Sequence, residues 1–157
     1  MKTVSGNRLT RNAAHLRTLQ LVLLVLTVCV IWGHSLMPAD ISDQESDQVS
    51  EYIEKHDLWL FRAPLLFLPL RKLAHMVEYA ALGFQLRLFR KGSGRILRAW
   101  LPGFFVAFID ETLQLATPGR NGDLRDVWLD AAGVAVGILL ALLLLRLLRG
   151  IASRPAA

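Results

Sequence analysis

Two acidic residues stand side by side in an apolar stretch that is long enough to cross a bilayer. They are Asp110 and Glu111, and the stretch covers residues 96–116. A charged side chain in hydrocarbon costs at least ~2.5–3.5 kcal/mol on insertion scales, so the pair needs a compensating environment. Either the carboxylates face polar partners inside a helix bundle, or they reach water at the bilayer edge.

Further ionisable side chains lie in the neighbouring apolar segments and in one connecting loop. Crowded carboxylates in a medium of low dielectric have raised pKa values and can act as general acids or bases. We therefore predict catalytic roles for His75, Asp110 and Glu111. Arginine suits bidentate contact with a phosphate or carboxylate, and a substrate-binding set is predicted as well. Its members are Lys72, Tyr79, Gln114, Arg120, Asp126 and Asp130.

The same region has enough oxygen and nitrogen donors for a divalent metal ion. The donors are His75, Glu78, Asp110, Glu111 and Asp130. The sequence contains no zincin helix, nucleophile elbow or phosphate-binding loop, so we assign no metal site and leave the cofactor open.

A structural interpretation of these charges competes with the chemical one. In it, a buried ion-pair network fixes the helix register and the acids are neutralised by Lys72, Arg120 and Arg125. Burying many charges for structure alone is costly, which favours a binding surface in either case. His34 and Ser35 are expected to face lipid headgroups, with the alternative that they join the polar cluster.

Four apolar segments must position these residues, and they predict an all-α membrane protein. The chain has 157 residues, of which 54% are hydrophobic. A span needs roughly 20 residues to cross ~30 Å of hydrocarbon, and its backbone polar groups must be satisfied within the helix. We predict spans at about 19–37, 72–90, 96–116 and 127–148. An N-terminal segment 1–18, an outer loop 38–71 and a tail 149–157 complete the chain.

The basic residues predict that both termini lie in the cytoplasm. With four alternating spans, twelve of the 18 Lys and Arg residues fall on the side of the termini and six on the other side. Basic residues are enriched on the cytoplasmic side of membrane proteins. The net charge of +5 is thus explained by topology and headgroup contacts, and no nucleic-acid partner is predicted.

The outer loop is acidic and predicts two local structures. Ser42–Glu45 fits a capping box at the start of a short amphipathic helix on the outer surface. Residues 58–70 are apolar but too short to span, and Pro64 and Pro69 interrupt them. This segment is interpreted as interfacial or re-entrant, or as a hydrophobic linker that covers the bundle.

Small residues predict which helix faces pack together. Gly103 and Ala107 lie on one face of the third span, below Asp110 and Gln114, and Gly133 and Gly137 lie on one face of the fourth. Membrane helices approach closely at such faces. If these two faces pack together, the acidic groups above them point into one cleft.

Two motifs resemble the VanZ-like membrane protein family. The first is Arg71-Lys-Leu-Ala-His75-x-x-Glu-Tyr79-x-x-Leu-Gly83, and the second is Asp110-Glu-x-x-Gln114-x-x-x-Pro118-Gly-Arg120, followed by Asp126. The resemblance extends over about residues 21–148. It implies a bacterial inner-membrane protein, typically of four helices, and the family's founding member is linked to low-level resistance to teicoplanin, a glycopeptide antibiotic.

Three functional hypotheses follow from the residues and the resemblance. In the first, a polar site at the outer face influences the cell envelope or teicoplanin susceptibility by binding. In the second, the chain is a hydrolase or transferase that acts on a lipid-linked envelope precursor. In the third, it is a proton-coupled transporter. The expected partners are the lipid bilayer and a lipid-linked cell-wall precursor or glycopeptide at the outer leaflet, and the oligomeric state is left open.

Overall fold

The computed structural model of the chain describes residues 3–58, 69–90, 96–120 and 122–152. These ranges contain five helices and no strand, which confirms the all-α prediction. The helices are α1 (Thr3–Ser35), α2 (Ala39–Lys55), α4 (Leu70–Phe89), α5 (Ile96–Leu115) and α6 (Leu124–Ala152).

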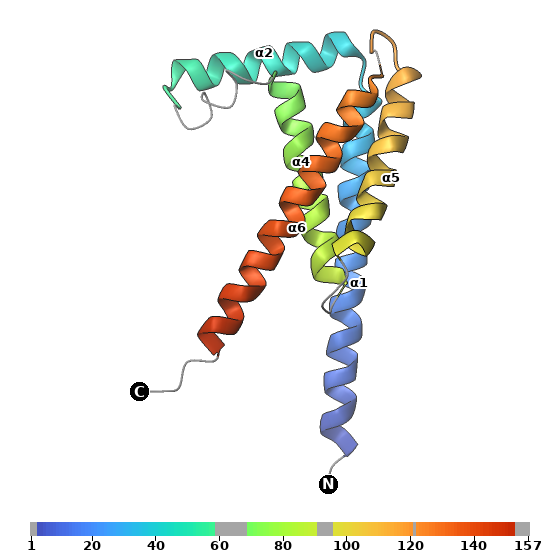
Figure 1. Cartoon of the computed structure of the whole chain (residues 1–157), viewed down its shortest axis with the longest axis vertical. Helices are drawn as coiled ribbons and strands as arrows, with labels where there is room; N and C mark the ends of the chain where they lie inside the picture. Colours follow the sequence, from blue (N-terminus) through green and yellow to red (C-terminus); the bar gives the residue numbers. More distant parts are fainter. Residues whose placement is uncertain (1–2, 59–68, 91–95, 121, 153–157) are drawn as a thin grey trace.

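Four of the helices form an open bundle, and α2 lies across one end of it (Figure 1). Helices α1, α4 and α5 run side by side, and α6 crosses them at an angle. The two termini lie at the end of the molecule opposite α2, where α1 and α6 diverge. This arrangement leaves one end of the bundle covered and the other end open.

Two of the described helices, α1 and α6, are long and apolar enough to cross a membrane. The qualifying segments are Ala14–Ser35, with 22 residues, and Leu124–Ile151, with 28 residues. Both carry exposed leucine and valine side chains, such as Leu23 on α1 and Leu139 on α6. Helices α4 and α5 have 20 residues each and carry ionisable groups, so the membrane character of the fold rests first on α1 and α6.

The first helix is longer than the predicted span of 19–37. It begins at Thr3, because no proline interrupts the basic segment before the apolar run. It ends at Ser35, close to the expected boundary. Pro38 disfavours a helical conformation of the residue before it, and this explains why the helix stops there.

Helix α2 is present as predicted, but the capping box at Ser42–Glu45 was wrong. The helix begins at Ala39 with Pro38 as its N-cap, so Ser42 lies inside the first turns and is buried. The Ala39 N–H, which a helix start leaves unpaired, donates to the carbonyl oxygen of Pro118 at 3.3 Å. A contact from a distant loop thus replaces the local cap. The predicted interfacial segment falls almost wholly in residues 59–68, outside the described residues.

The closest helix contact joins α4 and α6, and glycine permits it. A Cβ atom on Gly137 of α6 would overlap the carbonyl oxygen of Ala80 on α4, and one on Gly133 would lie 2.7 Å from the carbonyl oxygen of Met76. The prediction of a small-residue face on α6 is therefore confirmed. Its partner is α4, however, and not the Gly103 face of α5 as expected, because the α6 glycines lie against the α4 backbone.

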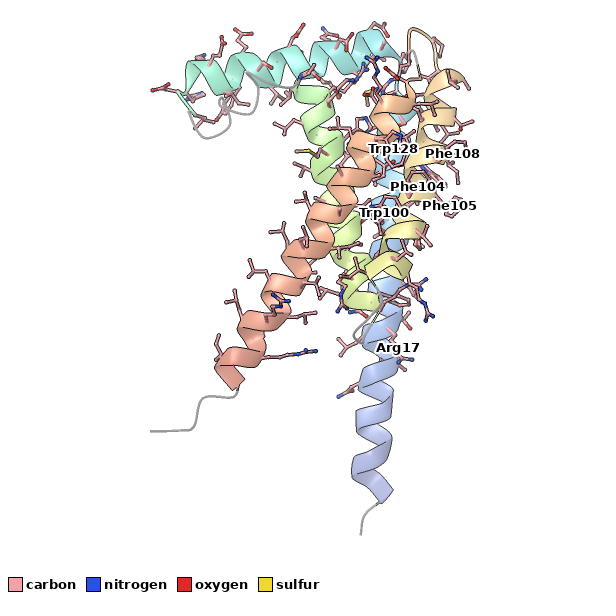
Figure 2. All side chains as sticks on the ribbon, viewed as in Figure 1. Arg17, Trp100, Phe104, Phe105, Phe108 and Trp128 are labelled. Atoms are coloured by element: carbon pink, nitrogen blue, oxygen red, sulfur yellow. The ribbon has the colours of Figure 1, made fainter. Side chains whose placement is uncertain are left out.

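Helix α5 packs against α6 through a different set of side chains. A Cβ atom on Gly103 would lie 2.7 Å from Cγ1 of Val134. The Trp100 indole donates to the carbonyl oxygen of Ala131 at 3.0 Å, and its ring stacks on Phe104 with centroids 5.1 Å apart. Figure 2 shows Trp100 and Phe104 on the side of α5 that meets α6. These contacts fix the height of α5 on α6.

Candidate functional site

The polar residues of the helices gather at the end of the bundle that α2 covers. Helix α4 contributes Lys72, His75, Glu78 and Tyr79. His75 lies three residues after Lys72, and Glu78 and Tyr79 lie three and four residues after His75, so all four lie toward one side of the helix. The end of α5 and the start of α6 lie at the same level (Figure 1). The structure therefore brings together the residues that the sequence analysis expected at one depth.

Asp110 lies at the centre of this cluster and is fully buried, with 0% of its surface exposed. Its Oδ2 accepts a hydrogen bond of 3.2 Å from the Gln114 side-chain amide. Nδ1 of His75 lies 4.0 Å from the same oxygen. The hydroxyl groups of Ser35 and Tyr79 lie close to this carboxyl group. Three helices thus surround a single carboxyl group.

A second buried carboxyl group, that of Asp130 on α6, joins this centre. One side-chain donor atom from each of His75, Asp110 and Asp130 lies within 4.8 Å of the other two. One turn earlier on α6, Asp126 accepts a hydrogen bond from the Lys72 ammonium group. The α6 acids therefore differ in environment: Asp126 has a cationic partner, and Asp130 faces the buried centre.

Glu111 lies apart from Asp110 although the two are adjacent in sequence. Neighbouring residues of a helix point about 100° apart. The Oε1 atom of Glu111 accepts a hydrogen bond of 2.5 Å from the backbone N–H of Asp123, just before α6 begins. In this position Glu111 holds the α5–α6 loop.

The loop between α5 and α6 clamps the corner between α1 and α2. The Thr117 hydroxyl donates to the carbonyl oxygen of Ser35 at 3.2 Å. Gly119 has a φ of +74°, which places Arg120 after a tight turn. Nε of Arg120 donates to the carbonyl oxygen of Met37 at 2.8 Å, and Nη2 donates to that of His34 at 2.9 Å. The guanidinium group therefore binds two backbone carbonyl groups where α1 ends, that of Met37 and that of His34, which also accepts from the Met37 N–H at 3.2 Å.

Arg120 retains one donor for a further partner. Its Nη1 atom is buried and has no hydrogen-bond partner among the described residues. Burial and the nearby positive charge of Arg71 lower the pKa of the Arg120 guanidinium below its usual value. An anion next to this group would offset both effects.

A cavity of about 240 Å³ lies beside Arg120 and beneath α2. Its charged and polar lining groups come from α1, α2, α4 and the α5–α6 loop. They include His34, Glu45, Arg71, His75, Glu78 and Arg120. Arg71 also contacts Asp43 of α2, with Nη1 and Oδ1 3.3 Å apart. The cavity thus combines arginine, histidine and glutamate side chains with an apolar wall.

His34 and Ser35 join the polar cluster, contrary to the expectation that they face headgroups. Nδ1 of His34 lies 2.5 Å from Oε1 of Glu78, and Ser35 is fully buried. The reason is that α1 ends level with the cluster, so its last turn packs against α4 and the α5–α6 loop. The α2 residues that line the cavity, such as Ser46 and Val49, were also missed, although the predicted amphipathic helix gave a signal for them.

The proposed ion-pair network is only partly present. Lys72 neutralises Asp126, but Arg120 binds backbone carbonyl groups and Arg125 is exposed. Within the described ranges, no lysine or arginine lies within 4.0 Å of the Asp110 or Asp130 carboxyl groups. The two central acids are therefore not paired with any of the lysine or arginine side chains that the structure describes.

The nine predicted site residues differ in their access to a ligand. His75 and Arg120 line the cavity beneath α2. A smaller cavity of about 10 Å³ is lined by His75 together with Lys72, Gln114, Asp126 and Asp130. Asp110, Glu111 and Tyr79 line neither of these two cavities. The catalytic and binding roles assigned to the nine residues remain predictions.

Comparison with known proteins gives one match. A family model described as VanZ/LLP1 matches residues 20–146. No curated protein sequence and no solved structure matches the chain. The matched range contains all of the residues that form the polar cluster and the cavity.

Proposed function

Since the chain belongs to the VanZ/LLP1 family, we propose that it binds an anionic, lipid-linked envelope precursor in the cavity beneath α2. In this proposal, binding influences the bacterial cell envelope and susceptibility to glycopeptides of the teicoplanin type. The observation that carries the proposal is the buried Arg120 guanidinium, whose free Nη1 atom lies beside a cavity that Arg71 also lines. Arginine binds phosphate and carboxylate groups through several N–H donors at once.

The proposal includes four membrane spans with both termini in the cytoplasm. Helices α4 and α5 join the two membrane-length helices in one bundle, and both termini lie at the end opposite α2 (Figure 1). Arg17 of α1 lies toward that same end (Figure 2), as the enrichment of basic residues on the cytoplasmic side requires. In this topology α2 and the cavity lie at the outer leaflet of the inner membrane.

The composition of the cavity suits a lipid with a charged headgroup. The lining combines Arg71, Arg120 and His75 with the apolar side chains of Val49 and Leu70. A phosphate would contact the guanidinium groups, and the start of an acyl or isoprenoid chain would follow the apolar wall into the bilayer. The cavity lies beside α2, so a lipid would enter along the membrane surface.

The test measures binding of a short-chain lipid pyrophosphate to the purified full-length protein. Arg71→Gln is the main variant, because the Arg71–Asp43 pair is partly exposed and its loss costs little stability. Arg120→Lys is the second variant, because it keeps a positive charge. We expect each to weaken binding by about tenfold, the equivalent of about 1.4 kcal/mol.

The matched control is Arg125→Gln, since Arg125 is exposed near the same end of the bundle and lines neither cavity. It should bind like the wild type. The same variants, placed in a deletion strain, should change teicoplanin susceptibility in parallel with binding. Binding unchanged in both Arg71→Gln and Arg120→Lys would reject the proposal.

A second candidate function is hydrolysis or group transfer on the same class of substrate. It is favoured by His75, which lines the cavity and whose Nδ1 lies 4.0 Å from Asp110. An imidazole backed by a carboxyl group is a common acid/base arrangement. Turnover of the lipid substrate that vanishes in Asp110→Asn, while binding and folding persist, would support this function. Absence of turnover in the wild type would leave binding as the activity.

A further inference from the structure

We propose that His75, Asp110 and Asp130 form a binding site for a divalent transition-metal ion. The site lies deeper in the bundle than the cavity beneath α2, and the inference goes beyond the binding function proposed above. Each residue comes from a different helix, α4, α5 and α6 respectively. An ion here would connect three helices at the level where the polar cluster meets the apolar part of the bundle.

The distances between the donor atoms fit coordination better than hydrogen bonding. One donor atom from each residue lies within 4.8 Å of the other two, and Nδ1 of His75 lies 4.0 Å from Oδ2 of Asp110. A hydrogen bond requires about 2.7–3.2 Å. Two ligands of one tetrahedral ion, each at about 2.1 Å from it, lie ~3.4 Å apart. Side-chain adjustments of about 1 Å would bring all three donors within reach.

Two of the donor groups are buried without a protein partner. Nδ1 of His75 and Oδ1 of Asp110 have no hydrogen-bond partner in the part of the chain that the structure describes. Their residues are 8% and 0% exposed. Buried polar atoms of proteins almost always have a partner. The hydroxyl groups of Ser35 and Tyr79 lie close to the Asp110 carboxyl group, whereas none of the described residues is within hydrogen-bonding distance of Nδ1 of His75.

The charge balance also calls for a cation. Asp110 and Asp130 lie close together, and none of the described basic side chains near them forms an ion pair with either: Lys72 binds Asp126, Arg71 contacts Asp43, and two nitrogen atoms of Arg120 bind backbone carbonyl groups. Two buried carboxylates repel one another unless a positive charge or a shared proton lies between them. A divalent ion would supply that charge, and the shared proton is the competing outcome of the test.

The surroundings of the three residues resemble those of a metal site. The Gln114 amide donates to Oδ2 of Asp110 at 3.2 Å and orients the carboxyl group, as second-layer groups do around bound metals. A 10 Å³ cavity next to these donors is lined by His75 and Asp130, and also by Arg71 and Lys72, but not by Asp110. One imidazole and two carboxylates without a thiolate favour Zn²⁺, Mn²⁺ or Fe²⁺ over copper(I).

The experiment loads purified full-length protein with Zn²⁺ or Mn²⁺ and measures bound metal by mass spectrometry after gel filtration. The variants are His75→Gln and Asp130→Asn, with Asp40→Asn as the matched control because Asp40 is exposed on α2. We expect close to one ion per chain in the wild type and in the control. Each site variant should lose at least tenfold in metal affinity.

Electron paramagnetic resonance of bound Mn²⁺ gives a second readout that does not depend on activity. Helix content and a single gel-filtration peak show which variants have folded. Two site variants are used so that one can replace the other if either His75→Gln or Asp130→Asn fails to fold. No bound metal in the folded wild type, or equal metal in the wild type and both site variants, would overturn the proposal and favour the shared proton. Neither result would affect lipid binding through Arg71 and Arg120, so the two proposals fail separately.

Discussion

The covered end of the bundle and its middle are held together in opposite ways. At the covered end, polar side chains from α1, α4, α5, α6 and the α5–α6 loop contact one another, and buried donors such as Nη1 of Arg120 remain without partners. In the middle, α4 and α6 approach so closely that Gly137 leaves no space for a Cβ atom beside Ala80. The middle is held by close steric packing. The covered end is held by polar groups, some of which have donors without a hydrogen-bond partner.

This contrast indicates that architecture and function occupy different turns of the same helices. Gly133 and Gly137 lie one and two turns beyond Asp130 on α6. Their contacts with α4 set how α6 crosses the bundle, and that crossing brings Asp130 close to His75. Bulky substitutions in the middle should therefore lower the free energy of unfolding strongly. Polar substitutions at the covered end should lower it less and should weaken ligand binding more.

The largest expected effect is that of Gly137→Leu. The new side chain would overlap the α4 backbone at Ala80, where no rotamer change can relieve the clash. Overpacking of this kind costs about 3 kcal/mol or more when the backbone must move. Unfolding in mixed micelles should show little folded protein. Gly33→Leu is the control, since Gly33 has no neighbouring atom within 4 Å of a Cβ position; equal stability of the two variants would contradict the packing account.

A smaller effect is expected for Arg120→Ala at the covered end. The substitution removes two charge-assisted hydrogen bonds to the carbonyl oxygens of Met37 and His34. Each is worth about 1.5–3 kcal/mol before water replaces it, so we expect a loss of ~2–4 kcal/mol in the free energy of unfolding. Hydrogen exchange should increase at the α1–α2 corner while the α4–α6 contact stays protected. A uniform loss of protection along α4 and α6 would show that the two regions are not separable.

Glu111→Gln should have a weaker effect still. The side-chain oxygen of glutamine can still accept the hydrogen bond from the Asp123 N–H. The loss is that of a charged acceptor at the start of α6, about 0.5–1 kcal/mol. Thermal unfolding in detergent measures it. A loss above about 3 kcal/mol would mean that the Glu111 carboxylate has a second role at the buried centre.

The smallest expected effect is that of Tyr79→Phe. The ring is fully buried, and its hydroxyl group lies close to the Asp110 carboxyl group but forms no hydrogen bond with any described residue. Removing an unpaired hydroxyl group while keeping the ring changes stability by less than about 1 kcal/mol. Chemical denaturation in micelles should give nearly superimposable curves for the variant and the wild type. A clear loss of stability would show that the hydroxyl group has a partner in the membrane.

Much of the fold could be predicted from the sequence because apolar length and helical spacing are local signals. The helices and the small-residue face of α6 follow from apolar length and periodicity, and the common level of His75, Asp110 and Asp130 follows from the alternating direction of successive helices. The start of α2 could not be predicted, because a carbonyl group of the distant Pro118 replaces the local cap. The partner of Gly133 was missed for a similar reason: spacing shows that a face is small but does not show which helix lies against it.

The sequence could predict which residues form the candidate site, but it could not predict which groups each of them contacts. Arg120 was expected to bind an anion or an acid, yet two of its nitrogen atoms bind the end of α1. Asp110 and Glu111 were treated as one pair, and the structure separates them into a buried carboxyl group and a loop contact. These partners depend on where α1 ends, and Pro38 shows only that it must end nearby.

The contacts between the Thr117–Arg120 turn and the α1–α2 corner impose an order on biogenesis. They join residues 82 and 86 positions apart, for example Thr117 with Ser35 and Arg120 with His34. The ribosome releases α1 and α2 long before it has made this turn, since chains are synthesised at about 5–20 residues per second. Helix α2 therefore gains these contacts only after the α5–α6 turn has been made. A nascent chain that stops before Thr117 would contain all of α2 and its Arg71–Asp43 contact with α4, and would still lack the turn that binds the α1–α2 corner.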